Sequence, residues 1–224
     1  MEYGTLLTDS KWNIIKELSK KEQTPTDLAE KTNTSLANIS QQLRLLEAYG
    51  LVKKERKINT KEPGKPRTVF SLGKEVMHTI IVSKYFAEKK DLELDYLQKA
   101  IFTLWMMERK EDIYYLEKFL ITNEEVIKKC DAIGLVKSDN EKIELLLVTE
   151  HIQDIRDKYS NQTVQNLEDK KKTIVCWTHN IKEIEEGIKG NNDHFIHLVK
   201  NLKSVLEKDN LIKKILDMKN EKNT

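Results

Sequence analysis

Apolar residues recur at intervals of three or four over the first fifty positions, and the interval then shortens to two. Intervals of three or four predict helices that bury one face, and an interval of two predicts strands. Thr24-Pro25 and Thr34-Ser35 are typical helix starts, and Gly50 suits a helix end. The inward positions of the three predicted helices are Trp12, Ile14, Ile15 and Leu18, then Leu28 and Ala29, then Leu36, Ile39, Leu43 and Leu46.

The chain after Gly50 predicts a pair of strands. Residues 51–58 are extended and basic, residues 59–66 contain Pro63-Gly64 and predict a turn, and inward positions alternate over residues 68–72. Three helices followed by a two-stranded hairpin predict a winged helix-turn-helix. We therefore assign residues 1–80 to a DNA-binding domain.

This segment also resembles a known family. Residues 39–52, ISQQLRLLEAYGLV, are similar to the recognition helix of the arsenical-resistance-repressor (ArsR) group, and residues 64–72, GKPRTVFSL, resemble the returning strand of its wing. The resemblance covers about a third of the chain and implies a DNA-binding transcriptional regulator. Metal sensors of that group carry paired cysteines on the recognition helix or histidine clusters on the terminal helix. This recognition helix has no cysteine, so metal sensing is not carried over.

The third helix carries side chains that suit the reading of base edges. With Ile39 inward, the opposite arc is polar and holds no acidic residue that phosphates would repel. Gln and Asn can pair with adenine and Arg with guanine, while a basic wing reaches phosphates or the minor groove. The predicted DNA-binding residues are Thr34, Ser35, Ala37, Asn38, Ser40, Gln41 and Arg44 in the helix, and Lys61, Lys65 and Arg67 in the wing. The alternative is a solvated polar face beside a charged hairpin.

Residues 92–150 repeat this order of elements and predict a second, degenerate winged-helix-like domain. Apolar helical stripes lead to residues 132–137, AIGLVK, which echo residues 48–53, AYGLVK, and then to a predicted strand. The echo is acidic: residues 134–150 hold two basic and four acidic side chains, against eight and two in residues 50–74. Because phosphate contact dominates DNA affinity, we expect this copy to pack or to contact protein.

The remaining residues, 151–224, predict a C-terminal α-helical hairpin or coiled coil. Two stripes with heptad-like spacing lie on either side of residues 190–193, namely Ile174, Trp177, Ile181, Ile184 and Ile188, and then Phe195, Leu198, Leu202, Val205, Ile212 and Leu216. The wider second stripe predicts a homodimer through these helices, and the alternative is packing onto the chain's own winged domains. The predicted fold class is mainly α with small β-wings, a tandem winged helix-turn-helix followed by this helical region.

Composition narrows the function classes. Seven glycines and three prolines in 224 residues disfavour sheet-rich folds and nucleotide-binding loops. The chain has no glycine-rich phosphate loop, nucleophile elbow or His-Glu-x-x-His motif, so we expect no enzyme and no cofactor. Neither a signal core nor an apolar run of membrane-spanning length is present, and Cys130 and Cys176 fall on apolar positions. These features predict a cytoplasmic protein with two buried thiols and no membrane partner.

Three histidines are the one candidate for a metal site. His179, His194 and His197 could approach one another across the predicted helical hairpin. A histidine cluster without cysteine or a second tight motif is a weak signal, so we expect no bound metal.

The first 80 residues carry fourteen basic against ten acidic residues, an excess that favours a polyanionic partner. The leading function is therefore a dimeric, sequence-specific regulator that binds double-stranded DNA with its third helix in the major groove. The alternative is a tandem winged-helix interaction scaffold that does not read DNA sequence. Binding of RNA or single strands is disfavoured because the basic region lacks aromatic stacking platforms.

Overall fold

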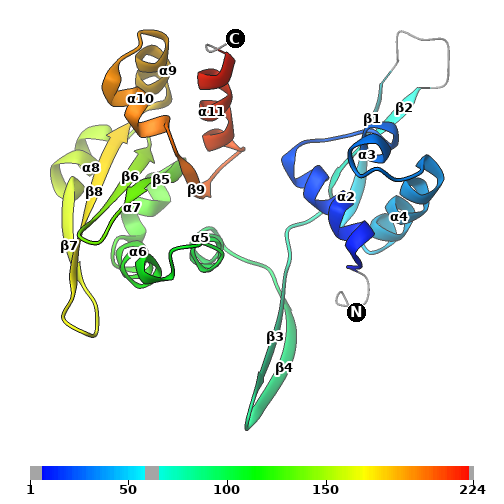
Figure 1. The fold of residues 1–224 in the computed structure, drawn as a ribbon, viewed down its shortest axis with the longest axis horizontal. Coiled ribbons are helices and arrows are strands. Elements are labelled where there is room, and N and C mark those ends of the chain that lie inside the picture. Colours follow the sequence, from blue (N-terminus) through cyan, green and yellow to red (C-terminus); the bar gives the residue numbers. More distant parts are fainter. Residues whose placement is uncertain (1–6, 59–65, 222–224) are drawn as a thin grey trace. The chain divides into compact units, whose positions relative to one another are not determined.

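The computed structural model describes residues 7–58 and 66–221. The chain divides into two compact units, Met1–Leu94 and Asp95–Thr224, here called unit 1 and unit 2 (Figure 1). Each unit has its own hydrophobic core.

Unit 1 begins with three helices and a strand pair. These elements are α2 (Asp9–Lys20), α3 (Pro25–Lys31), α4 (Leu36–Ala48), β1 (Val52–Ile58) and β2 (Arg67–Leu72), with β1 and β2 antiparallel. Helix α3 begins with a capping box, in which Thr24 Oγ1 accepts from the Asp27 N–H and the Asp27 carboxylate accepts from the Thr24 N–H. Gly50 follows α4 with φ of +71°, a left-handed conformation that glycine adopts without strain. The predicted winged helix-turn-helix elements are thus present in unit 1.

The core of unit 1 is formed by the inner faces of these helices and the first residues of the wing. Its buried members are Ile14, Leu18, Leu28, Ile39, Leu43, Leu46, Leu51, Val52 and Phe70. Two predicted inward residues were wrong, because Trp12 is 48% exposed and Leu36 is 50% exposed. Gln23 exchanges two backbone hydrogen bonds with Phe70, which ties the start of α3 to the wing strand β2.

A second strand pair follows the winged helix-turn-helix. Strands β3 (Met77–Ser83) and β4 (Phe86–Leu92) form an antiparallel hairpin with seven paired positions. The hairpin is a separate two-stranded sheet.

Unit 2 contains a mixed five-stranded sheet with the order β7-β8-β6-β5-β9. The strands are β5 (Ala132–Ser138), β6 (Lys142–Val148), β7 (Asn161–Gln165), β8 (Lys171–His179) and β9 (Lys203–Glu207). β6 and β8 are parallel, and the other neighbours are antiparallel. Every residue of β6 after Lys142 is buried, as expected for a central strand covered on both faces.

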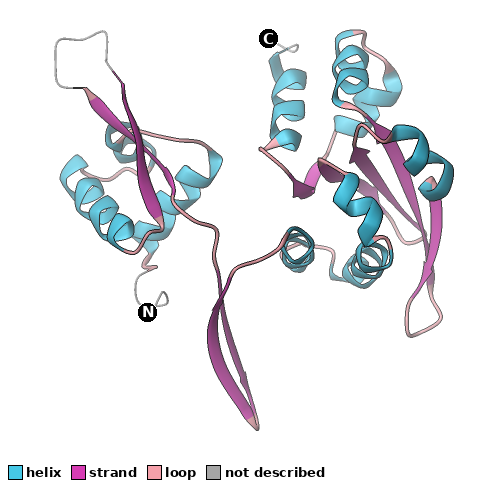
Figure 2. Cartoon of the chain, turned by 180° about the vertical axis from the view of Figure 1, so that it is seen from behind, coloured by secondary structure: helices cyan, strands magenta, loops and turns pink. Residues whose placement is uncertain are grey.

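Helices cover both faces of this sheet (Figure 2). One face packs against α5 (Tyr96–Trp105), α6 (Lys110–Thr122), α7 (Glu124–Lys129) and α8 (Ile152–Tyr159). The other face packs against α9 (Ile181–Lys189), α10 (Asp193–Val199) and α11 (Leu211–Glu221). Unit 2 is therefore a three-layer α/β/α domain.

This architecture corrects the predicted fold class, because the chain is neither a tandem winged helix-turn-helix nor a C-terminal helical hairpin or coiled coil. The segment AIGLVK, which echoed the end of a recognition helix, is the inner strand β5. Gly134 serves close packing there, since a Cβ atom at that position would lie 2.5 Å from Leu202 Cδ1. Residues 171–179, predicted as helix, form β8, whose residues alternate between the two faces.

The expectation that few glycines disfavour a sheet-rich fold was also wrong. Within residues 7–58 and 66–221, asparagine and aspartate occupy five positions with positive φ: Asn33, Asp169, Asn191, Asp209 and Asn210. These short polar residues tolerate the left-handed conformation, so they replace glycine in the tight connections.

Candidate nucleic-acid interface

Helix α4 is held by its buried face. Ile39, Leu43 and Leu46 are at most 1% exposed and fix the helix on the unit 1 core. The helix begins at the N-cap Ser35, whose Oγ accepts from the Asn38 N–H at 3.3 Å. The opposite face of α4 is consequently directed outward.

The predicted helix residues divide into two groups by exposure. Ser35, Ala37, Gln41 and Arg44 are exposed, whereas Thr34, Asn38 and Ser40 are half-buried. The half-buried polar groups already make internal hydrogen bonds: Thr34 Oγ1 donates to Thr32 O at 3.1 Å, Ser40 Oγ donates to Leu36 O at 2.8 Å, and Asn38 Oδ1 accepts from Gln42 Nε2 at 3.0 Å. In the described part of the chain, no hydrogen bond or ion pair engages Gln41 or Arg44. These two side chains can therefore contact another molecule without breaking a hydrogen bond or ion pair within the protein.

A shallow cavity of about 400 Å³ connects α4 with the wing. It is lined by residues of α3, α4, β1 and β2, including Arg44, Lys54 and Arg67. Arg67 thus lies near Arg44, although the two are 23 positions apart in sequence. Lys61 and Lys65, the other predicted wing residues, lie outside the described residues.

Acidic neighbours neutralise much of the basic charge of β1, which the sequence did not indicate. Lys54 Nζ lies 2.8 Å from Glu47 Oε2, and Arg56 Nη1 lies 2.6 Å from Glu22 Oε2. Lys53 pairs with Glu55, whose pKa is lowered first by a hydrogen bond from Ser71 and then by that lysine. The dense basic run therefore overstates the positive charge that this strand offers to a polyanion.

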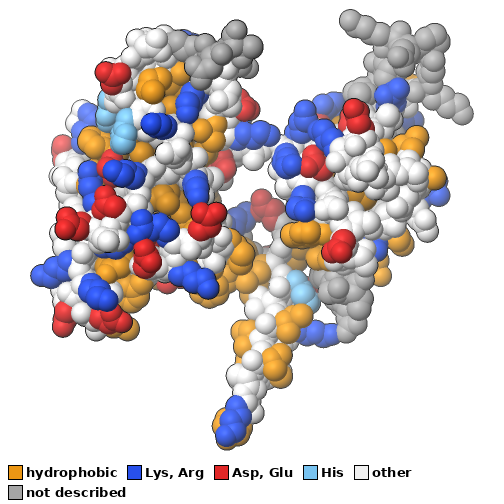
Figure 3. Space-filling view, in the orientation of Figure 1, with side chains coloured by type: hydrophobic (Ala, Val, Ile, Leu, Met, Phe, Trp, Pro, Cys, Tyr) orange, Lys and Arg blue, Asp and Glu red, His pale blue; other side chains and the backbone are white. Residues whose placement is uncertain are grey.

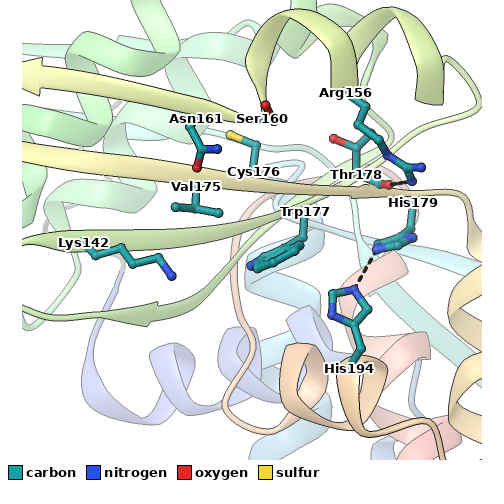
Figure 4. A pocket seen from close by; sticks show the side chains of 10 residues that line it. All are labelled: Lys142, Arg156, Ser160, Asn161, Val175, Cys176, Trp177, Thr178, His179 and His194. Carbon is teal, nitrogen blue, oxygen red and sulfur yellow. Dashed lines mark hydrogen bonds between the residues drawn. The ribbon is translucent and has the colours of Figure 1, made fainter.

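Unit 2 has its own cavity of about 570 Å³, at the end of β8 (Figure 4). Trp177 and His179 of β8 line it, together with Lys142 of β6 and His194 of α10. The indole N–H of Trp177 donates to Glu144 Oε2 at 2.9 Å. Aromatic and cationic groups thus line the cavity, and one of the aromatic groups is hydrogen-bonded to a carboxylate.

The predicted approach of the histidines holds for two of the three. His179 Nε2 and His194 Nε2 lie 3.1 Å apart, and His179 Nδ1 lies 2.8 Å from Glu183 Oε2. His197 instead lies beside Glu144, with 3.4 Å between His197 Nε2 and Glu144 Oε2. Among residues 7–58 and 66–221, no three or more His, Cys, Asp or Glu side chains converge in a way that could hold a metal ion.

The histidine pair predicts a pH-dependent stability. Burial, followed by the nearby His179 and His197, lowers the pKa of His194 below the ordinary histidine value of 6.5. Since the unfolded chain then binds the proton more readily than the folded chain, stability should fall as pH falls through the region below 6.5. We expect thermal unfolding to show a lower midpoint at pH 5.5 than at pH 7.5, and His194→Asn to reduce that difference. An unchanged difference in this variant, or an equal reduction in the exposed-residue control His151→Asn, would contradict this assignment.

Both cysteines are buried free thiols, as predicted. Burial raises the pKa of Cys130 and of Cys176 to about 12, so both stay protonated at neutral pH. Neither thiol is suited to act as a nucleophile.

In the part of the chain that the structure covers, no helix combines the length and the apolar composition needed to cross a membrane. A comparison with curated proteins found no match. A family comparison does find one: residues 8–54, which contain α2, α3, α4 and the start of β1, match the model of bacterial regulatory proteins of the arsR family. The N-terminal part of the chain is therefore similar to the helix-turn-helix of ArsR-family regulators, which points to a DNA-binding transcriptional regulator rather than an enzyme.

Proposed function

We propose that the protein is a transcriptional regulator that binds double-stranded DNA sequence-specifically, with α4 in the major groove and the wing on the backbone or in the minor groove. The observation that carries this proposal is the outer arc of α4. It presents Ala37, Gln41 and Arg44 with no acidic residue among positions 34–46, and its two long polar side chains are unengaged. Such an arc suits the donor and acceptor groups of base edges.

The predicted residues divide into those that contact bases and those that contact the DNA backbone. Gln41 pairs with adenine and Arg44 with guanine, since these amide and guanidinium groups match the major-groove edges of those bases. Ala37 leaves room for a base edge or a thymine methyl group. The short side chains near the helix start, and the wing residues, contact phosphates or sugars; they are Thr34, Ser35, Asn38, Ser40, Lys61, Lys65 and Arg67.

The salt dependence of duplex binding tests this function. A protein that neutralises phosphates releases counterions, so the logarithm of its affinity falls linearly with the logarithm of the salt concentration. We expect fluorescence anisotropy with a labelled duplex to give a clear negative slope between about 50 and 200 mM salt. Absent or salt-independent binding would instead favour the interaction scaffold.

Neutralising the wing tests the contribution of its cations. Lys61→Gln, Lys65→Gln and Arg67→Gln together should weaken binding to every duplex and reduce the salt slope by up to about three units per subunit, because each phosphate contact contributes about 0.9. A matched control replaces Lys158, Lys182 and Lys200, exposed lysines of unit 2, with glutamine. Equal slopes for the wing variant and the wild type would place the wing away from phosphate.

We further propose that the regulator acts as a homodimer, because one winged helix contacts a single half-site and stable operator binding usually needs two. The C-terminal helices, through which the sequence predicts the dimer, do not offer exposed apolar stripes for it. Ile184, Ile188, Leu198, Ile212 and Ile215 are buried against the sheet of unit 2. The dimer interface is therefore to be sought elsewhere in the chain.

A further inference from the structure

The β3–β4 hairpin exposes more large apolar side chains than any other short segment of the described chain. Tyr85 is 88% exposed, Val82 78%, Ile80 61%, Ile81 50% and Phe86 49%. Figure 3 shows hydrophobic side chains gathered along the hairpin. An isolated two-stranded hairpin is only marginally stable in water, and contiguous exposed apolar surface marks interaction sites. The hairpin thus has the properties of an interface element.

The two strands of this hairpin differ in chemistry. β3 contains the run Thr79-Ile80-Ile81-Val82, four consecutive β-branched residues without a formal charge, which is typical of a strand with a neighbour on each side. β4 contains Glu88-Lys89-Lys90-Asp91, and charged residues of this kind protect an edge strand from further pairing. β4 is therefore built as an edge strand, whereas the open edge of β3 is unprotected.

We propose that the β3 strands of two copies of the chain pair antiparallel, giving a four-stranded sheet with the order β4-β3-β3-β4. This inference deepens the proposed function, because it gives the homodimer its interface. Pairing through β3 would satisfy the backbone groups of its open edge and bring the apolar side chains of both copies together. A two-fold axis normal to the sheet relates the copies, so the interface is self-complementary.

Charge and register favour a second copy as the occupant. With Ile81 opposite its own counterpart, Ile80 faces Val82 of the second copy and Thr79 faces Ser83, and no charged side chains meet in these pairs. The only titratable group of β3, His78, is engaged within its own hairpin, where its Nδ1 lies 2.7 Å from Asp91 Oδ1. Pairing through β4 would instead place Lys89 or Lys90 opposite its own copy, and like charges directly opposite are destabilising.

Such a sheet would also serve DNA binding. It would join two winged helix-turn-helix units, so that binding of the second half-site becomes intramolecular. A monomeric variant should keep its non-specific duplex affinity per subunit but lose most of its affinity for a two-half-site operator.

Analytical ultracentrifugation of the full chain without DNA tests this inference. We expect the wild type to be dimeric at tens of micromolar, and Ile81→Lys or Ile81→Glu to raise the dimer dissociation constant by at least about 100-fold, since like charges would meet at the centre of the interface. An equimolar mixture of the two variants should associate again, because residue 81 then meets its opposite charge. Ala87→Lys, which adds the same charge to an exposed position of β4, should remain dimeric.

The mixture of Ile81→Lys and Ile81→Glu tests the proposed register, because the two variants should associate only if residue 81 of one copy faces residue 81 of the other. Circular dichroism and non-specific duplex binding verify that the variants are folded. A monomeric wild type, a dimer that survives Ile81→Lys, or a mixture that stays monomeric would overturn the inference. If the sedimentation results hold but no duplex is bound, the proposed function fails and the interface stands.

Discussion

Replacing Arg44 or Gln41 by alanine is expected to cost roughly 1–3 kcal/mol on the preferred duplex, or about 5- to 150-fold in Kd. Each side chain is exposed on α4, and neither is engaged by another group in the described chain. The loss therefore reflects contacts made in the complex rather than damage to the fold. Non-specific duplex affinity should change far less, because phosphate contacts that supply it lie mostly elsewhere.

The control for this pair is Lys16→Ala. It removes one positive charge from an exposed position of α2 and should weaken specific and random duplexes alike, if it has any effect. Isothermal titration or anisotropy with both duplexes at one salt concentration gives the comparison. Equal losses on specific and random duplexes for Arg44→Ala and Gln41→Ala would show that α4 is not the reading helix.

The largest expected effect on stability comes from a buried ion pair in unit 2. Lys172 Nζ lies 2.6 Å from Asp112 Oδ1 and donates to Asp139 O at 2.8 Å. Asp112 Oδ2 accepts from Ser138 Oγ at 2.6 Å, and Arg109 Nε lies 3.3 Å from it. The side chains of Lys172 and Asp112 are 7% and 2% exposed. The pair joins α6 to β8 inside the domain.

Asp112→Asn should reduce the free energy of unfolding by about 3–5 kcal/mol, because removal of one partner leaves a buried charge without compensation. Replacing both partners, as Asp112→Leu with Lys172→Met, should cost clearly less than this single change. Urea denaturation of the full chain measures both effects.

A surface ion pair provides the matched control. Lys170 and Glu168 lie 2.8 Å apart and are both more than two-thirds exposed. Glu168→Gln should leave the urea midpoint unchanged within error, as expected for an exposed pair. A midpoint shift for Asp112→Asn no larger than that for Glu168→Gln would contradict the role of the buried pair.

Local signals in the sequence predicted the elements of the winged helix-turn-helix. The capping pair Thr24-Pro25 and the left-handed Gly50 act within a few residues of their own positions. The spacing of Ile39, Leu43 and Leu46 also indicated the buried face of α4, and hence which side chains point outward. Such features can be predicted from neighbouring residues alone, without information on contacts between distant parts of the chain.

Unit 2 could not be predicted in the same way, because its strands depend on partners far along the chain. Ile174, Trp177, Ile181 and Ile184 have helical spacing, yet the first two lie in β8 and the others in α9. What fixes β8 as a strand is its parallel pairing with β6, about 30 positions earlier. Lys172 is the last of three consecutive lysines, and strand alternation turns it inward toward Asp112.

At the candidate interface, the sequence alone did not predict the ion pairs of the basic strand or the exposed hairpin. Glu22 and Glu47 both lie outside the basic strand that they neutralise, before the start of α3 and at the end of α4. The C-terminal stripes that predict a dimer belong to the core of unit 2. The sequence predicts no element for residues 81–91, which include most of the exposed hairpin. The β-branched run of this hairpin can be seen in the sequence. Its role as an interface follows only from the structure, in which one edge of β3 is unpaired.

Selection of bound duplexes from a random pool, followed by competition between the selected and a scrambled duplex, tests the central claim most directly. We expect an enriched sequence that the full-length protein binds at least about 1,000-fold more tightly than the scrambled duplex at the same salt concentration. Failure to enrich any sequence, or equal affinity for the two duplexes, would contradict the assignment of this protein as a sequence-specific regulator.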